Sequence, residues 1–195
     1  MIDKILKAKH WQIFIVAFGL PFFIQFVSIL FIILSDNPMA ILKVMPIIMI
    51  FFIGGLYAWF WSIGVGLQAK VPSTVKMNVK LFKVFFVIPL LYMLLIVSAM
   101  LLVFNGAFDD SANSGPGMFA MLFAFIFPCH IFSMFCMFYC LYFVARTFKT
   151  VELQREVSFS DFAGEFFMIW FFPIGIWIIQ PKINQMMEEE VGLTK

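Results

Sequence analysis

Four long apolar runs constrain the fold of this chain more than any other feature. A helix needs about 20 mostly apolar residues to cross the ~30 Å hydrocarbon core of a bilayer. The runs that reach this length, allowing for some tilt, are residues 13–34, 44–67, 84–104 and 118–144. We therefore predict an all-α integral membrane protein, a bundle of four transmembrane helices with a short membrane-embedded element towards the C-terminus.

The composition agrees with a membrane protein. Of the 195 residues, 64% are hydrophobic and 12% are charged, whereas a soluble domain is about half apolar and about a quarter charged. No polar stretch is long enough for a second domain, so residues 1–195 are interpreted as one membrane domain. The basic residues are too few and too spread for a nucleic-acid surface, and we expect membrane lipids, through their anionic phosphates, to be their partners.

The placement of charge predicts the topology. Lysine and arginine are concentrated in the N-terminal segment, between Lys70 and Lys83, and between Arg146 and Arg155. The loop between the third and fourth runs contains "DDSANSGPG" and no basic residue. Short loops rich in lysine and arginine stay in the cytoplasm. The N-terminus and both basic segments are therefore predicted to be cytoplasmic, with Lys43 a mild exception that can snorkel.

Small residues recur every four positions in the second run. Residues four apart share a helix face, and small side chains there let another membrane helix approach closely. Two interpretations remain open: packing against the other spans of the same chain, or a homo-oligomer interface. The candidate helix-packing residues are Gly54, Ala58, Ser62 and Gly66.

The fourth run carries a second stripe of small, slightly polar residues that could dock on the first. An odd number of cysteines inside a membrane core does not indicate a disulfide framework. These candidate packing residues are Cys129, Ser133, Cys136 and Cys140.

His130 stands beside this stripe. His130, Met134 and Met137 share a neighbouring face, and such soft ligands suit Cu(I). Because the chain has no Cys, His or Met cluster outside the membrane to supply the metal, we predict no metal site. We expect His130 to hydrogen-bond to a carbonyl or to Gln25, and both side chains are candidates for a polar lining.

The residue types that intramembrane chemistry uses are scarce. Apart from Lys43 at an edge, no Asp, Glu, Lys or Arg lies within a predicted span. The sequence has no phosphate-binding glycine loop, metalloprotease histidine pair or nucleophile elbow. We therefore predict a protein that is not an enzyme, with no catalytic residue and no cofactor.

The stretch "WFFPIGIWIIQP" belongs to an apolar element at residues 166–180. Trp170 and Trp177 are separated by about 10 Å along a helix, too little to reach both bilayer interfaces. We expect Pro173 and Gly175 to break the element in the middle, so that it is buried or re-entrant and the C-terminus is cytoplasmic. A short tilted fifth crossing is the alternative. We also expect contacts between this element and spans two and four, or a partner.

Helix starts are predicted on both sides of this element. In "SFSD", Ser158 can cap a helix and Asp161, three residues on, favours its positive end. Pro181 suits the first turn of a separate polar helix that contains "PKINQMMEEE".

The stretch "VELQREVSFSDFAGEFFMIWFFPIGIWIIQPKIN", together with "KAKHWQIF", resembles a group of small polytopic bacterial membrane proteins of unassigned function. The likeness covers about a quarter of the chain and is strongest in "FFPIGIWIIQPKIN". The resemblance implies a bacterial inner-membrane location and no catalytic activity.

We predict a non-enzymatic membrane subunit that self-associates or packs with partner membrane proteins. The main alternative is an oligomeric channel, pore or transporter for small or apolar solutes, lined by Gln25, Ser62, His130 or Ser133. A lipid-modifying enzyme would instead need convergent polar groups near the cytoplasmic face. The residues available for that are His10, Gln68, Asp161, Glu165 and Gln180.

Overall fold

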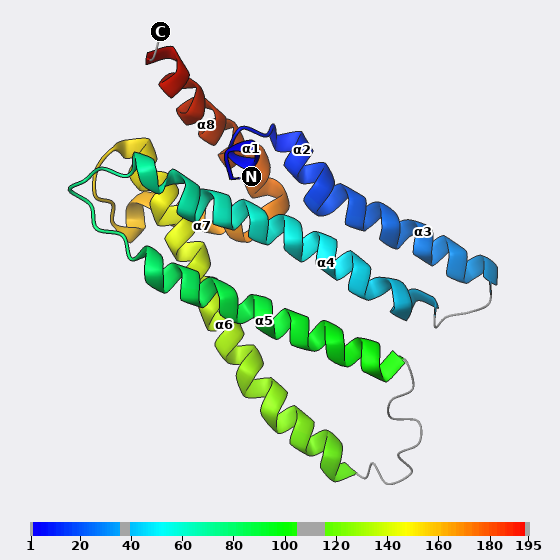
Figure 1. Ribbon diagram of the computed structural model, residues 1–195. Coiled ribbons are helices and arrows are strands. Elements are labelled where there is room, and N and C mark those ends of the chain that lie inside the picture. Colours follow the sequence, from blue (N-terminus) through cyan, green and yellow to red (C-terminus); the bar gives the residue numbers. More distant parts are fainter. Residues whose placement is uncertain (1, 36–39, 105–115, 194–195) are drawn as a thin grey trace.

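The computed structural model describes residues 2–35, 40–104 and 116–193, and within these ranges every regular element is a helix (Figure 1). The all-α membrane fold predicted from the sequence is confirmed. The elements are α1 (Ile2–Leu6), α2 (His10–Phe14), the π-helical turn η1 (Ile15–Gly19), α3 (Leu20–Ser35), α4 (Ala40–Trp61), the π-helical turn η2 (Ser62–Gly66), the 3-10 turn η3 (Leu67–Lys70), α5 (Val79–Phe104), α6 (Pro116–Leu153), α7 (Phe159–Trp170) and α8 (Phe172–Leu193).

Among the described residues, four helical segments are long and apolar enough to cross a membrane. Each coincides with one of the predicted apolar runs, and neither α7 nor α8 is among them. The protein is therefore a multi-pass membrane protein with four spans. The segments are His10–Phe31, Val44–Lys70, Val79–Leu101 and Phe123–Leu153.

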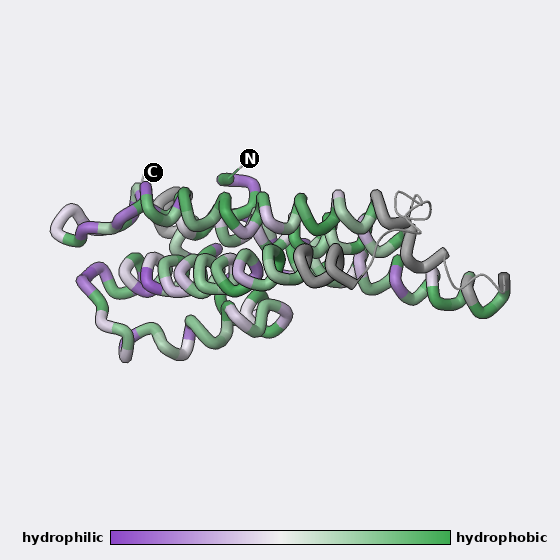
Figure 2. The backbone as a smooth tube through the Cα atoms, turned by 90° about the horizontal axis from the view of Figure 1, so that it is seen from below, coloured by the Kyte–Doolittle hydropathy of each residue, from purple (hydrophilic) through white to green (hydrophobic). Residues whose placement is uncertain are grey.

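The four spans form two helical hairpins. In one, α3 packs beside α4, and in the other α5 packs beside α6. The hairpins meet around η2 and η3, near the end that carries both termini, and diverge towards the opposite end (Figure 1). In the most apolar stretch of each span, no more than 22% of the residues are buried. Exposed apolar side chains lie on every span, among them Phe22, Phe51, Leu91 and Phe125. Figure 2 shows hydrophobic residues along most of the length of the spans.

The packed core lies where the hairpins meet. Trp59, Phe60, Phe82 and Phe148 are almost completely buried there. The rings of Phe82 and Phe143 stack with centroids 4.5 Å apart, which joins α5 to α6. Large rings supply many van der Waals contacts, the main attraction between helices in a membrane. The most densely packed part of the fold therefore lies at the end that carries the basic segments.

The last span continues beyond the predicted boundary at residue 144. Helix α6 runs to Leu153, and Phe148 and Val151 on this extension are buried. Gln154 then adopts a left-handed conformation with φ of 51°, and its side-chain amide donates to the carbonyl of Val151 over 2.8 Å. This ends the helix and turns the chain towards α7.

The predicted start of α7 is confirmed. Ser158 and Asp161 form a reciprocal capping box, in which the Ser158 backbone N–H donates to the Asp161 carboxylate over 2.8 Å. The element at residues 166–180 is bent, as predicted, but the break lies at Phe171, between α7 and α8. Helix α8 then packs back along α7 and returns to the end that carries the N-terminus (Figure 1).

Three predictions for this part of the chain were wrong. Pro173 lies in the first turn of α8, where its missing N–H is tolerated, so it starts that helix instead of breaking it. Gly175 does not interrupt α8; a Cβ at this position would collide with the carbonyl of Met168, so the glycine lets α8 approach α7. Pro181 does not start a separate helix, because α8 continues through it to Leu193.

The expected contacts with spans two and four are confirmed. The Phe172 ring lies 6.2 Å from Phe52 and 5.5 Å from Trp59, both on α4. The Trp170 ring makes an edge contact at 4.9 Å with Phe138 of α6. The bent element therefore packs against α4 of one hairpin and α6 of the other.

Candidate functional site

The basic segments and both ends of the described chain gather at one end of the bundle. The Lys70 ammonium donates to the carbonyl of Met186 over 2.9 Å, joining the loop after span two to α8. The Gln154 amide donates to the carbonyl of Lys70 over 3.3 Å. Polar residues from four parts of the sequence thus meet here, and this end is the best candidate for a functional surface.

Gln180 makes hydrogen bonds to several parts of the chain at this end of the bundle. Its side chain is completely buried, and its Oε1 accepts a hydrogen bond of 2.8 Å from the indole N–H of Trp59. Its Nε2 group faces three backbone carbonyls, those of Ile5 at 3.2 Å, Leu6 at 3.0 Å and Ala8 at 2.9 Å. One amide therefore ties the turn between α1 and α2 to both α8 and α4.

Asn184 reinforces this attachment. It lies one turn after Gln180 on α8, and its amide donates to the carbonyls of Leu6 over 2.9 Å and Ala8 over 3.1 Å. These carbonyls follow the end of α1 and have no partner within a continuing helix. The two amides satisfy them, which allows the chain to leave α1 and start span one at His10.

A chain of ion pairs joins α6, α7 and α8. The Lys182 ammonium lies 2.8 Å from Glu152, and Lys149 lies 2.6 Å from Glu152 and 2.8 Å from Glu165. Glu165 is buried, so its pairing with Lys149 compensates for its loss of water. A partly buried network of this kind fixes geometry more effectively than isolated surface pairs. Helix spacing predicts the Lys149–Glu152 pair, which is three residues apart, but the other two pairs join residues 16 and 30 apart and could not be predicted from the sequence.

The cap of α7 carries a strongly acidic carboxyl group. The Arg155 guanidinium, 3.0 Å from Asp161, and the backbone N–H and hydroxyl of Ser158 hold the pKa of Asp161 at about 2, below its usual 3.8. A carboxylate whose folded-state pKa is lowered stabilises the fold above its unfolded pKa. That stabilisation is lost as the pH falls through the folded pKa.

We expect the Asp161→Asn substitution to lower the melting temperature of the protein near neutral pH. The difference from the wild type should shrink as the pH falls from about 4 to about 2, since Asp161 itself becomes protonated over that range. Thermal unfolding in detergent, followed as a function of pH, measures this difference in melting temperature. Glu156→Gln removes a mostly exposed carboxylate and is the control. A difference that stays constant throughout the acidic range would contradict the assignment.

The five polar residues considered for a lipid-modifying enzyme do not converge. His10 packs against the Trp177 ring at 4.7 Å, and Gln68 donates to the Gly64 carbonyl over 2.8 Å and towards Thr147 over 3.3 Å. Asp161, Glu165 and Gln180 are each engaged with the separate partners described above. The geometry brings no acid, base and nucleophile together among these five.

The close approach between helices in span two falls at Gly55. A Cβ on Gly55 would lie 2.5 Å from the Cβ of Ala17, whereas Gly54, one of the predicted packing residues, has no atom within 4 Å of such a Cβ. Gly66 packs against Ile2 and Leu6 of α1. Residues four apart do not stay on one helix face here, because α4 passes into a π-helical turn at Ser62–Gly66.

The other two residues of this ladder occupy different surroundings. Ser62 is buried, and its hydroxyl donates to the carbonyl of Ala58 over 2.7 Å. Ala58 is half-buried and lines a groove towards the N-terminal segment. The two residues therefore do not form one continuous face with Gly54, which is exposed.

The stripe in span four faces inwards. Ser133, Cys136 and Cys140 are buried, and Cys129 is half-buried. Cys140 belongs to the core cluster that also contains Tyr57 of α4. These small residues thus lie on the side of α6 that meets the rest of the bundle.

His130 has a different partner from the expected one. Its Nδ1 lies 3.1 Å from the Tyr92 hydroxyl of α5. The partner in this hydrogen bond is therefore neither Gln25 nor a carbonyl. Gln25 lies on α3, and α4 and α5 separate α3 from α6 (Figure 1). In the part of the chain that the structure describes, no group of three or more His, Cys, Asp or Glu side chains is placed to hold a metal ion.

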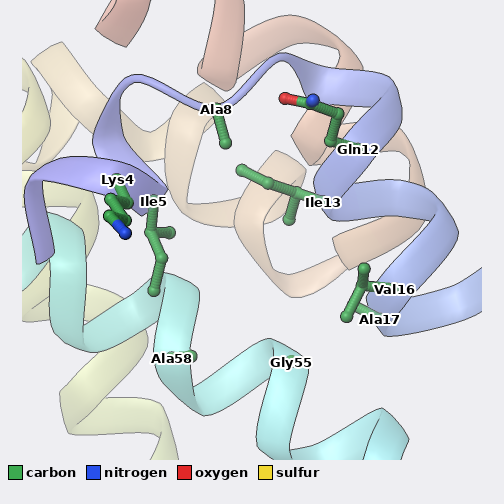
Figure 3. A pocket seen from close by; sticks show the side chains of 9 residues that line it. All are labelled: Lys4, Ile5, Ala8, Gln12, Ile13, Val16, Ala17, Gly55 and Ala58. Atoms are coloured by element: carbon green, nitrogen blue, oxygen red, sulfur yellow. The ribbon is translucent and has the colours of Figure 1, made fainter. Parts of the chain in front are cut away.

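Two apolar cavities flank α4. One, of about 230 Å³, lies against the N-terminal segment, with Lys4 and Gln12 among its lining residues (Figure 3). The other, of about 410 Å³, lies between α4, α6 and the turn from α7 to α8, and Phe171 and Pro173 contribute to its wall. The cavity against the N-terminal segment combines an apolar interior with a cationic group and an amide group, so it can recognise a ligand more specifically.

Comparisons of the chain with protein-family models, curated proteins and solved structures found no match. Function therefore has to be argued from the geometry itself.

Proposed function

We propose that this protein is a non-enzymatic membrane subunit that associates with itself or with partner membrane proteins. The observation that carries the proposal is the low burial of the spans, none of which has more than 22% of its most apolar stretch buried. Diverging hairpins leave apolar helix faces on which further transmembrane helices can pack.

The exposed small residue Gly54 supports a protein partner. It lies within span two on an exposed part of α4, and a Cβ there would meet no atom within 4 Å. Small residues lower the closest distance between two membrane helices, which favours helix association over contact with disordered lipid tails. Gly54 is therefore the position at which we place a contact with another helix.

We further propose a bacterial inner-membrane location with both termini in the cytoplasm. The support is the common end shared by the N-terminal segment, the Lys70–Lys83 loop, the Arg146–Arg155 segment and α8, since basic segments remain on the cytoplasmic side. The sequence resemblance agrees with this location. Figure 2 shows hydrophilic residues concentrated near this end.

Crosslinking in native membranes tests the association. We expect covalent species larger than the monomer, and we expect Gly54→Leu to reduce their yield several-fold because the new side chain keeps helices apart. Gly164→Leu is the matched control, since Gly164 also has no neighbour within 4 Å but lies on α7, outside the spans. A strict monomer with no crosslinked partner, or equal yields for both variants, would overturn the proposal.

A further inference from the structure

The groove between the N-terminal segment and α4 has the character of a site for a hydrocarbon chain. Gly55 and Ala58 of α4 line one side, and Ile5 of α1, Ile13 of α2 and Ala17 of η1 line the rest (Figure 3). Its volume of about 230 Å³ is smaller than the ~300–1,000 Å³ of pockets that enclose a whole small ligand. It therefore suits part of a larger molecule.

The rim of the groove is cationic. Lys4 and Gln12 lie on either side of Ala8 in Figure 3. The Gln12 Oε1 accepts from the Lys9 backbone N–H over 2.9 Å, which fixes the amide and leaves its NH₂ group as the end that can bind a ligand. Hydrogen-bond donors and positive charge at one rim favour an acceptor-rich anion.

The charge around the rim is positive overall. Lys7 shares a helix face with Lys4, because the Lys7 N–H continues the α1 turn by donating to the Asp3 carbonyl over 3.0 Å. Lys4, Lys7 and Lys9 are exposed, and Asp3 is the one acidic residue between positions 2 and 12.

The depth of the groove matches the bilayer. Span one starts at His10, and Ala17 lies about 10 Å further along the helix axis. With the lysines at the level of the headgroups, the apolar floor lies within the hydrocarbon region. A molecule that fills both parts has an anionic head and an apolar chain.

We propose that the groove binds an anionic phospholipid, with an acyl chain against Gly55 and Ala58 and the phosphate at Lys4 and the Gln12 amide. The apolar lining offers nothing to a free phosphate ion, and the cationic rim favours an anionic lipid over a zwitterionic one. Basic pockets beside transmembrane helices bind anionic headgroups in this way. The site goes beyond the proposed function and does not depend on it.

Native mass spectrometry of the full-length protein in detergent tests this site. The protein is titrated with phosphatidylglycerol or phosphatidylcholine, each with and without excess inorganic phosphate. We expect phosphatidylglycerol to be retained more tightly, and inorganic phosphate not to displace it. Lys4→Gln should weaken its binding about fivefold, the equivalent of ~1 kcal/mol for one lysine near anionic lipid.

Two further variants separate the groove from general electrostatic attraction. Ala58→Leu leaves the charge unchanged and fills the groove, so it should also weaken phosphatidylglycerol binding. Lys80→Gln removes an exposed lysine from the start of α5 and should leave binding unchanged. The proposal is overturned if both lipids bind equally, if inorganic phosphate displaces the lipid, or if Lys80→Gln weakens binding as much as Lys4→Gln.

Discussion

Replacing Gln180 with leucine is expected to release the N-terminal segment from the bundle. The substitution removes the acceptor of the Trp59 indole N–H and the donor to the carbonyls of Ile5, Leu6 and Ala8. Each buried polar group left without a partner costs about 1–3 kcal/mol. The Leu6 and Ala8 carbonyls keep the Asn184 amide as a donor, and the Ile5 carbonyl keeps the Ala8 N–H, so the Trp59 indole N–H is the group that loses its partner. We therefore expect a loss of about 1–3 kcal/mol and a lower melting temperature.

Thermal unfolding in detergent and limited proteolysis measure this effect. The bonds after α1 should become accessible to protease in Gln180→Leu at temperatures where the wild type resists cleavage. Gln185→Leu changes an exposed glutamine on the same helix and should behave as the wild type. Equal behaviour of the two variants would show that the Gln180 hydrogen bonds do not hold the N-terminal segment.

Gly55→Leu is expected to separate η1 from α4. A Cβ at Gly55 would lie 2.5 Å from the Cβ of Ala17 and 2.7 Å from its Cα, so the contact involves backbone that cannot rotate away. Overpacking of a well-packed site costs about 1–3 kcal/mol, and a contact with backbone lies at the upper end of that range. We expect a lower melting temperature and a reduced yield of folded protein.

The neighbouring glycine provides the control for this prediction. Gly54→Leu introduces the same side chain into the same turn, but it points into open space within the monomer. It should keep the monomer's melting temperature in detergent while reducing crosslinking in the membrane. A larger loss of monomer stability for Gly54→Leu than for Gly55→Leu would contradict the packing described here.

The number and position of the spans could be predicted because they depend on length and hydropathy alone. An apolar run that crosses the bilayer must satisfy its backbone hydrogen bonds internally, so it becomes a helix whatever its neighbours are. The capping box of Ser158 and Asp161 was likewise predictable, since its geometry involves residues only three apart. Local rules were sufficient in both cases.

The contacts between spans were not predictable to the same degree. A ladder of small residues indicates a face, but the choice between Gly54 and Gly55 depends on the path of η1, the π-helical turn that contains Ala17. Glutamine in an apolar run gives no indication of its partner. The role of Gln180 emerges only when α8 folds back and brings it to Trp59 and to the turn after α1.

Synthesis proceeds from the N-terminus, so the two sides of the Gln180 contacts are made at different times. The carbonyls of Ile5 and Ala8 leave the ribosome 175 and 172 residues before the amide that binds them. Contacts this distant in sequence form late in folding. The N-terminal segment must therefore wait at the membrane surface, with its lysines against the headgroups, until α8 has been made. Because α8 follows all four spans in the sequence, the N-terminal segment gains its contacts with Gln180 and Asn184 only after the last span has been synthesised.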